Sequence, residues 1–568
     1  MYLLRVNMHT GSISKEPVEE DLIYLGGRGL SSKLIARDVP AHIEPLGNNN
    51  KLILAPGLLT GTSVPSSGRL SIGAKSPLTG TIKESNVGGT AGQRLARFGI
   101  KAIIIEEKPV DNSWYVLHVN SEKIELLPAD YLAGKGNYDT AKELRKRYGD
   151  KVSIVSIGPA GESCFSAATV AVTNIEGNSS RHAGRGGMGA VMGSKQLKAI
   201  IVAKPDSTAS LAPQQPERYK KAIKRFALAL KSHPTTGKVL PTYGTTTLVK
   251  MVNELGALPT RNYSSGQFER AEEISGDTFL NLISQRGGRT GHACHPGCVI
   301  KCSNVFNSSE GEYVTSGLEY ETIGMLGANC GISSLDVIAK ADRLCDDLGL
   351  DTVETGAAIG IAMEAGILNF GDGEAMLSLI REVGKGTIMG RLLGHGSVIT
   401  GKVLGVNRVP AVKGQSMAAY DPRTLKGVGV TYATSPMGAD HTGGNGLGGD
   451  VDPLKPEGQI EYSIKFQEAA AYFDSLGLCW FTRAPILGDL TLVTEIANSL
   501  FGTDWGPEDI VNIGKMVMRF EKDFNKRAGF NESHDRLPEF MLTEKNRPHE
   551  TVFDVSAPEM AKLFSKNT

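Results

Sequence analysis

Short runs of apolar and β-branched residues alternate with glycine-rich turns over the first 205 residues of the chain. Four clear runs begin at Lys51, Lys101, Val152 and Lys198, and the chain itself opens on a similar strand-like stretch. Apolar runs of this length, bounded by glycine, are typical of strands. The pattern therefore predicts a β-rich N-terminal region over residues 1–205.

From about Pro213 the spacing of apolar residues changes to the period of a helix. The stretch from Pro216 to Leu228 repeats apolar side chains every three to four residues, and Ser334 stands as an N-cap before an amphipathic run. A stretch rich in glycine and proline, at about 385–460, is expected to interrupt the helices, which then resume to about residue 525. The predicted fold class is α+β, with a β-rich N-terminal domain followed by mainly helical domains.

The chain length predicts several domains. A chain of 568 residues is too long for a single core and indicates two to four domains. We expect three domains, at 1–205, 206–400 and 401–568, and we expect the second and third domains to be mainly helical.

Composition excludes several classes of function. Lysine plus arginine and aspartate plus glutamate each total 61, so no net charge points to nucleic acid or an anionic membrane. No apolar run approaches a membrane span, and seven cysteines are too few for a disulfide framework, which favours a cytoplasmic location. The 68 glycines cluster in motifs, which favours backbone packed closely against a large ligand.

Four cysteines form the pattern with the clearest chemistry. They are Cys294, Cys298, Cys302 and the distant Cys479. Pro296 and Gly297 break any helix between the first two, so the cluster of three lies on a loop. Four thiolates suit an iron–sulfur cube or a structural zinc ion. Three buried cysteines on a turn are the alternative. A radical-enzyme loop, Cys-x3-Cys-x2-Cys, has a different second gap.

Two helix ends repeat one another. Asp-Asp-Leu-Gly-Leu-Asp at 346–351 and Asp-Ser-Leu-Gly-Leu-Cys at 474–479 each place glycine as a left-handed cap behind an acidic residue. They are either two ordinary helix ends or two related segments that face similar halves of one ligand. The second segment closes with Cys479, which would bring this cysteine beside the three-cysteine loop.

Small residues stand beside isolated arginines in the N-terminal region. The segments 67–69, 86–89 and 181–187 combine glycine or serine with exposed backbone N–H groups, and two of them carry arginine. Such groups form phosphate sites, although glycine turns of a β-rich domain explain any single one of them. Together they suggest a cofactor with more than one phosphate.

With these motifs, the chain resembles the aldehyde:ferredoxin oxidoreductases, tungsten enzymes that hold two pterins on one metal beside a [4Fe-4S] cluster. The resemblance extends from Gly26 to about Phe530. The motifs that carry it are the segments 65–69, 183–195, 319–322, 420–423, 432–435 and 438–441, and the paired Asp-x-Leu-Gly-Leu segments.

The resemblance implies a set of cofactor-binding residues, with the cofactors at the domain interface. For the pterins and their phosphates these are Arg69, Asn86, Gly88, His182, Ala183, Gly184, Arg185, Asp346, Leu350, Asp351, Asp474 and Leu478. The cluster ligands would be Cys294, Cys298, Cys302 and Cys479. A magnesium ion would bridge the pterin phosphates, with backbone carbonyls near Asn86 and Ala183 as candidate ligands. The pterin dithiolenes hold either tungsten or molybdenum.

The chain departs from the family pattern in two ways. The first cysteine gap is usually Cys-x2-Cys in the family and is Cys-x3-Cys here, which indicates a distinct subfamily. The Glu-x-x-His motifs that hold a metal at a dimer interface in some members are not evident. No interface metal is therefore expected, although a homodimer remains open.

The implied reaction converts an aldehyde and water to a carboxylic acid, releasing two electrons and two protons. Electrons would leave through the cluster to ferredoxin or to an iron–sulfur partner subunit. Glu321 matches the family glutamate that activates water or takes the proton. Glu319, two residues earlier, is the alternative match to that glutamate. His441 matches the histidine that hydrogen-bonds the substrate oxygen.

Other cysteines and other functions stay open. Cys330 is either core packing or a residue that approaches the metal, whereas Cys164 and Cys345 are expected to be structural. A relative that uses the same cofactor as a low-potential reductase of an aromatic acyl thioester or a carboxylate is the second function. A zinc-stapled binding protein without redox activity is the third.

Overall fold

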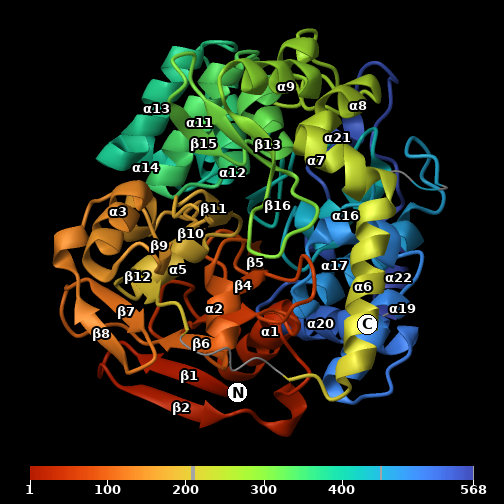
Figure 1. Cartoon of the computed structure of the whole chain (residues 1–568). Coiled ribbons are helices and arrows are strands. Elements are labelled where there is room, and N and C mark those ends of the chain that lie inside the picture. Colours follow the sequence, from red (N-terminus) through yellow and green to blue (C-terminus); the bar gives the residue numbers. More distant parts are fainter. Residues whose placement is uncertain (206–211, 448, 450, 567–568) are drawn as a thin grey trace.

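The N-terminal region contains two six-stranded sheets, in a computed structural model that describes residues 1–205, 212–447, 449 and 451–566 (Figure 1). The first sheet consists of β1 (Tyr2–Asn7), β2 (Ile13–Pro17), β3 (Leu52–Pro56), β4 (Leu70–Lys75), β5 (Ile82–Val87) and β6 (Ile100–Glu106). The second consists of β7 (Tyr115–Val119), β8 (Ile124–Pro128), β9 (Ser153–Ser156), β10 (Val170–Val172), β11 (Arg181–Ala183) and β12 (Leu197–Val202). The apolar runs of the sequence form β3, β6, β9 and β12.

The two sheets have the same topology. Their strand orders are β2-β1-β6-β3-β4-β5 and β8-β7-β12-β9-β10-β11, and in each the pair β1/β6 or β7/β12 is parallel while all other pairs are antiparallel. The helices between the strands are α1 (Gly27–Asp38), α2 (Ala91–Arg97), α3 (Asn137–Tyr148), α4 (Pro159–Glu162) and α5 (Met188–Ser194). The region is thus built from two equivalent repeats, which contact each other at β5 and β11.

The two repeats share one apolar core. Leu54 and Ile103 of the first sheet and Val155 and Ile200 of the second are fully buried in the same cluster. Because strands buried on both faces carry continuous apolar runs rather than alternating ones, the sequence shows these strands clearly.

The rest of the chain is mainly helical, so the predicted α+β fold class is confirmed. Its helices are α6 (Pro216–Ser232), α7 (Leu240–Tyr243), α8 (Leu248–Glu254), α9 (Gly276–Gln285), α10 (Tyr320–Thr322), α11 (Leu335–Leu348), α12 (Thr352–Glu364), α13 (Gly373–Lys385), α14 (Ile388–Gly394), α15 (Ser397–Leu404), α16 (Lys426–Thr434), α17 (Gln459–Leu476), α18 (Arg483–Ile486), α19 (Thr491–Phe501), α20 (Pro507–Arg527), α21 (Glu539–Thr543) and α22 (Ala557–Lys566). The expected interruption at 385–460 was wrong in part, because α14, α15 and α16 lie within it. These helices contain glycine at 390, 394, 401, 427 and 429, so glycine did not prevent helix formation here.

Two small sheets lie within the helical part. β13 (Arg289–His292), β14 (Ser303–Asn307) and β15 (Tyr313–Ser316) form the first, and β16 (Ala411–Val412) pairs with β17 (Gln415–Ser416). The loop between β13 and β14 carries the three clustered cysteines. In the described ranges no single helix is long and apolar enough to cross a membrane, although the bent pair Tyr320–Cys330 and Leu335–Leu348 has the length and composition together.

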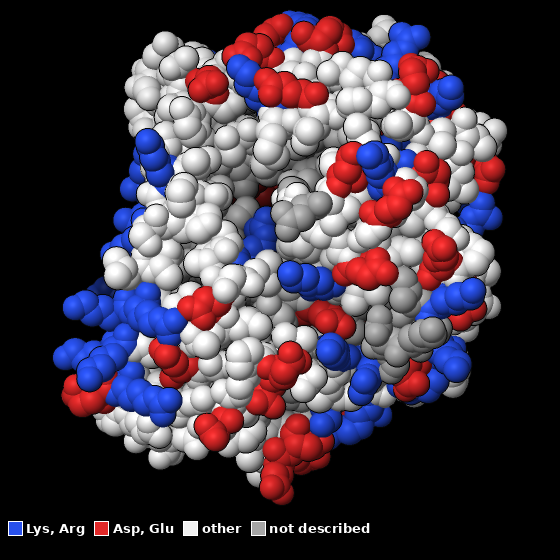
Figure 2. All heavy atoms as spheres, turned by 90° about the vertical axis from the view of Figure 1, so that its right-hand side faces the viewer, with Lys and Arg blue, Asp and Glu red and all other residues white. Residues whose placement is uncertain are grey.

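Charged side chains of both signs mix over most of one face of the molecule, with basic side chains gathered along its left edge (Figure 2). A hollow opens near the centre of this face. The mixture agrees with equal totals of 61 basic and 61 acidic residues.

A buried ion pair fastens the first repeat to the C-terminal helices. Arg28 on α1 donates from Nε and Nη2 to the two carboxylate oxygens of Glu521 on α20, over 2.8 and 2.7 Å. Ser32 donates to the same carboxylate at 2.8 Å. The Arg28 side chain is 1% exposed and that of Glu521 is 0% exposed. Breaking such a pair leaves a buried charge without compensation.

The substitution Glu521→Gln is therefore expected to lower the free energy of unfolding by about 3–5 kcal/mol. Chemical denaturation measures this change. Asp523→Asn on the same helix is the matched control, because Asp523 lies 3.6 Å from Arg527 on the exposed face. The control should cost less than about 1 kcal/mol. Equal effects of the two substitutions would contradict the stabilising role of the buried pair.

Candidate functional site

Two helices end in the same way. α11 and α17 both stop at a glycine in the left-handed conformation, Gly349 (φ 76°) and Gly477 (φ 77°). The residue after each glycine donates its N–H to the carbonyl five positions back, over 2.8 Å from Leu350 and 3.0 Å from Leu478. This is the bond of a Schellman motif. The echo in the sequence therefore corresponds to two matching helix ends.

Each helix end contacts one repeat of the N-terminal region. The carbonyl of Gly477 accepts from Arg69 N–H at 3.3 Å, and the carbonyl of Gly349 accepts from Thr169 N–H at 2.9 Å. Arg69 immediately precedes β4 and Thr169 immediately precedes β10, which are equivalent strands. A Cβ on Gly57 would lie 2.1 Å from the Cα of Gly477, so only glycine permits this approach.

The first repeat presents a guanidinium and an amide beside α17. Arg69 donates from Nε to Asn86 Oδ1 at 2.5 Å. A Cβ added to Gly88 would lie 3.2 Å from Arg69 Nη1 and 3.4 Å from Cys294 Sγ, so bare backbone passes between them. Asp474 lies 3.7 Å from Arg28, and burial followed by the charge of Glu84 raises the pKa of the Asp474 carboxyl well above its ordinary value.

The second repeat presents the equivalent groups beside α11. His182 on β11 accepts or donates through Nδ1 to Thr169 Oγ1 at 2.7 Å, and its Nε2 lies 3.1 Å from Asp346 Oδ1. Ala183 completes the strand and is buried. Gly184 faces open space, since a Cβ there would have no neighbour within 4 Å. Arg69 with Asn86 and Thr169 with His182 are thus matching pairs in the two repeats.

Arg185 is a fixed positive charge between the repeats. It lies 3.3 Å from Asp351 and donates to the carbonyls of Ser416 and Ala439 at 2.6 and 2.8 Å, and its backbone N–H donates to Ser85 Oγ at 3.2 Å. Burial lowers the pKa of Arg185, but nearby carboxylates, Asp351 foremost, more than offset this and raise it. Burial raises the pKa of Asp351 to about 6 against the influence of Arg185.

The four candidate cluster cysteines lie around one chain segment. Cys479 N–H donates to the carbonyl of Ser66 at 2.9 Å, and Ser66 N–H donates to the carbonyl of Gly297 in the three-cysteine loop at 3.0 Å. Each of the four is at most 9% exposed: Cys294, Cys298, Cys302 and Cys479. The segment around Ser66 therefore joins the end of α17 to the cysteine loop.

The thiols also affect one another's titration. Burial lowers the pKa of Arg69, but Cys479, Cys294 and Asp474 more than offset this and raise it. A hydrogen bond from Cys294 lowers the pKa of Cys298 to about 7. Burial, then Glu319 and Cys479, raise the pKa of Cys302. The four buried thiols thus lie near Arg69 and near one another, and ligand atoms of Cys294, His295 and Cys298 lie within 4.8 Å of one another. Thiols gathered in this way suit an iron–sulfur cluster.

Glu321 and His441 face each other across the neighbouring part of the site. The carboxylate oxygen Oε2 of Glu321 accepts from Ala419 N–H at 2.8 Å, and Oε1 lies 3.5 Å from His441 Nε2. Glu321 Oε1 and His441 Nδ1 are buried and have no hydrogen-bond partner. The ring of Tyr420 lies 6.3 Å from that of His441. Free polar atoms at this depth are available to a substrate.

An ion pair holds the segment before His441. Asp440 N-caps the turn that contains His441, accepting from Thr442 N–H at 2.9 Å, and it pairs with Lys83 on β5. Burial raises the pKa of Asp440, but Lys83 and Arg185 outweigh it and hold the pKa well below the ordinary value. Asp440 is therefore ionised, and its position fixes His441 against the first repeat.

Glu319 and Glu321 point to different places. Glu319 accepts from Thr245 Oγ1 at 2.6 Å and lies near Cys302, not near His441. Burial raises the pKa of Glu319.

Cys330 donates to the carbonyls of Met325 and Gly356 at 3.3 and 3.5 Å, as a thiol packed in the core does.

Sequence reasoning missed part of the site. Thr169, Lys83 and Asp440 entered no prediction, although each of them positions a predicted residue. One signal could have found the equivalence of the repeats. An acidic residue, leucine two positions later and glycine four positions after that occur at both 20–26 and 130–136. Each stretch forms a single turn before the glycine that precedes α1 or α3, so the two stretches mark the same point of each repeat.

Four buried cysteines near one another, beside the points where α11 and α17 meet the two repeats, suit a protein that holds a metal cluster. Two family models match the chain: "Aldehyde ferredoxin oxidoreductase, N-terminal domain" over residues 3–204, and "Aldehyde ferredoxin oxidoreductase, domains 2 & 3" over residues 221–564. The chain therefore belongs to the aldehyde ferredoxin oxidoreductase family and is an oxidoreductase, which confirms the expected membership.

Curated relatives and a solved structure agree with this assignment. The chain is 35% identical to a tungsten-containing aldehyde ferredoxin oxidoreductase of Pyrococcus furiosus, over 99% of this chain and 95% of that protein. It is 35% identical to the protein of the same name from Thermococcus kodakarensis, over 95% and 91%. The active site complex of benzoyl coenzyme A reductase with 1,5-dienoyl-CoA superposes with a TM-score of 0.80 at 20% identity, covering 99% of this chain and 92% of that one. This last likeness shows the fold alone.

Proposed function

We propose that this protein is a tungsten or molybdenum bis-pterin enzyme that oxidises an aldehyde to a carboxylic acid. Its electrons pass through a [4Fe-4S] cluster to an acceptor. One observation carries the proposal: two matching helix ends meet two matching β-repeats, and one of these helix ends, through Cys479 and Ser66, is bonded to the cysteine loop. A pair of similar pterins fits a pair of similar cradles, and relatives 35% identical carry tungsten in their names.

The residues present fit the cofactors that the family implies. Arg69, Asn86, Gly88, Asp474 and Leu478 would hold one pterin. The second would be held by His182, Ala183, Gly184, Arg185, Asp346, Leu350 and Asp351. The open space at Gly184 and the buried charge of Arg185 suit an anionic phosphate nearby. A magnesium ion between the phosphates, with carbonyls near Asn86 and Ala183, completes the proposed set.

When bound, the metal supplies Lewis acidity and accepts two electrons. The remaining chemistry falls to side chains of this chain. Glu321 is held through Oε2 by Ala419 N–H, so Oε1 is free to take a proton from water. His441 can donate a hydrogen bond to the substrate oxygen from Nδ1, the ring nitrogen without a partner, and Asp440 fixes the position of the histidine. The side chains of His441 and Glu321 are 18% and 17% exposed, so solvent reaches both groups only in part.

Partners and location follow from the same proposal. The substrate is a small aldehyde or acid, and the electron acceptor is ferredoxin or an iron–sulfur partner subunit. All seven cysteines are free, which favours a reducing, cytoplasmic location. The division at 1–205, 206–400 and 401–568 places the cofactors between domains, while residues 206–211, at its first boundary, lie outside the described residues. A homodimer is compatible with this arrangement.

Anaerobically purified protein is expected to contain iron and a group-six metal, and to reduce a viologen dye when an aldehyde is added. Elemental analysis, visible absorption and an anaerobic dye assay measure these properties. A visible band that dithionite bleaches would identify the cluster.

Two outcomes would contradict the proposal in different ways. Zinc in place of iron would indicate a stapled protein without redox activity. Iron and tungsten together with turnover of an aromatic acyl thioester, but of no aldehyde, would assign the chain to the low-potential reductases instead. Protein from cells grown without tungsten or molybdenum is the control for dye reduction by the cluster alone.

A further inference from the structure

One nitrogen in the cysteine loop lacks a partner. His295 lies between Cys294 and Pro296 and its side chain is fully buried, with 0% exposure. Its Nε2 is a buried atom without a hydrogen-bond partner. A buried polar atom left unpaired costs free energy, and a bound ion is one of the partners that can offset this cost.

The other ring nitrogen determines which atom is free to bind. His295 Nδ1 lies 3.0 Å from the carbonyl oxygen of Pro296, which also accepts from Gln93 Nε2 at 2.7 Å. A carbonyl oxygen only accepts, so the proton is on Nδ1 and Nε2 carries a bare lone pair. A histidine that binds a metal commonly donates its other N–H to a backbone carbonyl in this way.

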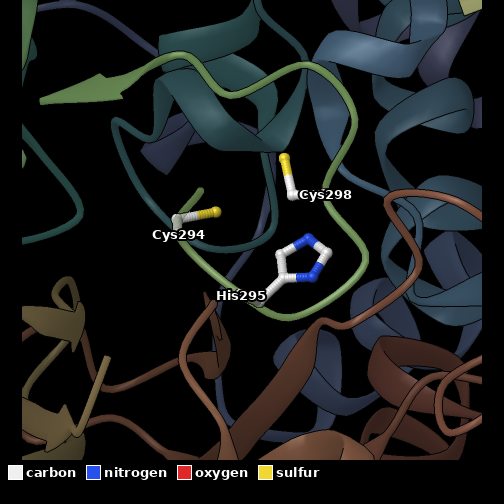
Figure 3. A group of neighbouring side chains, drawn as sticks. All are labelled: Cys294, His295 and Cys298. Carbon is white, nitrogen blue, oxygen red and sulfur yellow. The ribbon is translucent and has the colours of Figure 1, made fainter. Parts of the chain in front are cut away.

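The ring is also fixed in place among the thiols. A Cβ added to Gly68 would lie 2.3 Å from His295 Nδ1, so the ring packs directly on backbone. Figure 3 shows the imidazole below the side chain of Cys298, on the loop that also carries Cys294. One ligand atom of each of these three residues lies within 4.8 Å of the other two.

We propose that His295, through Nε2, binds the iron at the corner of the cluster that Cys294 would otherwise hold. The ligands would then be His295, Cys298, Cys302 and Cys479. This inference rests on the iron–sulfur cluster of the proposed function and refines its ligand set. Cys294 and His295 are adjacent in the chain and compete for one corner. With His295 as the first ligand, two residues separate it from Cys298 and three separate Cys298 from Cys302. Both spacings are found in cluster-binding loops.

The exchange has a chemical consequence. A neutral imidazole in place of a thiolate removes one negative charge from the cluster, and histidine ligation raises the reduction potential of iron–sulfur centres. Cys294 would then remain a free thiol beside Gly88, where its Sγ would be 3.4 Å from an added Cβ. Both features are measurable without any turnover.

The test compares the unmodified holoenzyme with His295→Ala and Cys294→Ser. Pulsed electron paramagnetic resonance on the dithionite-reduced cluster should detect the strong coupling of a directly bonded nitrogen in the unmodified protein and in Cys294→Ser. His295→Ala should lose this coupling. If Cys294 then binds the iron in place of His295, the reduction potential of the cluster should fall. His395→Ala is the matched control, because His395 is a partly buried histidine that contacts Ser166 and Phe165 and not the cysteine loop.

Iron in the protein without strongly coupled nitrogen, or a coupling that survives in His295→Ala, would overturn this proposal alone. Protein without iron would overturn it together with the cluster of the proposed function. Failure to oxidise aldehydes, with the nitrogen coupling present and lost in His295→Ala, would overturn the proposed reaction and leave the ligand assignment supported.

Discussion

Replacing Cys479 with alanine is expected to remove the iron–sulfur cluster. The backbone of Cys479 is fixed by its bond to Ser66, which places this thiol at the loop that carries Cys298 and Cys302. A cube takes four protein ligands, and the loop residue left over, Cys294, belongs to the corner that its neighbour His295 occupies, not to the corner held from the end of α17. Iron should fall from about four atoms per chain toward none.

Iron analysis and the visible spectrum measure this loss. Cys164→Ala is the control, since Cys164 is partly exposed and packs away from the pocket. It should keep full iron content. Because the cluster joins α17 to the cysteine loop, Cys479→Ala should also lower the melting temperature of the anaerobic protein. Unchanged iron in Cys479→Ala would rule this residue out as a ligand.

The elements that the sequence predicted well are those with local causes. Glycine caps at 349 and 477 depend on left-handed backbone that few other residues adopt, so the two Asp-x-Leu-Gly-Leu segments predicted two helix ends. The buried strands of the N-terminal region were visible because continuous β-branched runs are typical of strands covered on both faces.

The equivalence of the two β-repeats was harder to predict. Topology and hydrogen-bond positions persist when two copies diverge, whereas most side chains change. Arg69 and Thr169 occupy equivalent places and donate the same backbone bond, yet one side chain is a guanidinium and the other a hydroxyl. The short stretches 20–26 and 130–136 keep a trace of the common pattern.

Contacts between distant segments could not be read from the sequence at all. Lys83 and Asp440 are 357 positions apart, and nothing local indicates that they pair. The choice between Glu319 and Glu321 depends on the same kind of information. Both residues stand at the start of α10. Glu319 bonds to Thr245 and Glu321 bonds to Ala419, and these contacts with distant segments point the two side chains in different directions.

The substitution Glu321→Gln is expected to lower the turnover of aldehyde by about 10²–10⁴-fold, which is the usual contribution of a general base. The amide keeps the volume of the carboxyl and can still accept from Ala419 N–H, but it cannot take a proton from water. Iron and tungsten contents should not change, since Glu321 is not among the proposed cofactor ligands. Anaerobic dye reduction with saturating aldehyde measures turnover, and elemental analysis of the same sample measures loading.

Glu319→Gln is the matched control for this experiment. Glu319 lies two residues away and bonds to Thr245, away from His441, and its Gln replacement keeps the volume of the side chain. The Gln side chain can still accept the hydroxyl of Thr245. Turnover should therefore stay within a few fold of the unmodified enzyme. The opposite result would be an inactive Glu319→Gln enzyme and an active Glu321→Gln enzyme. That result would assign the base to Glu319. The 3.5 Å approach of Glu321 to His441 would then be structural.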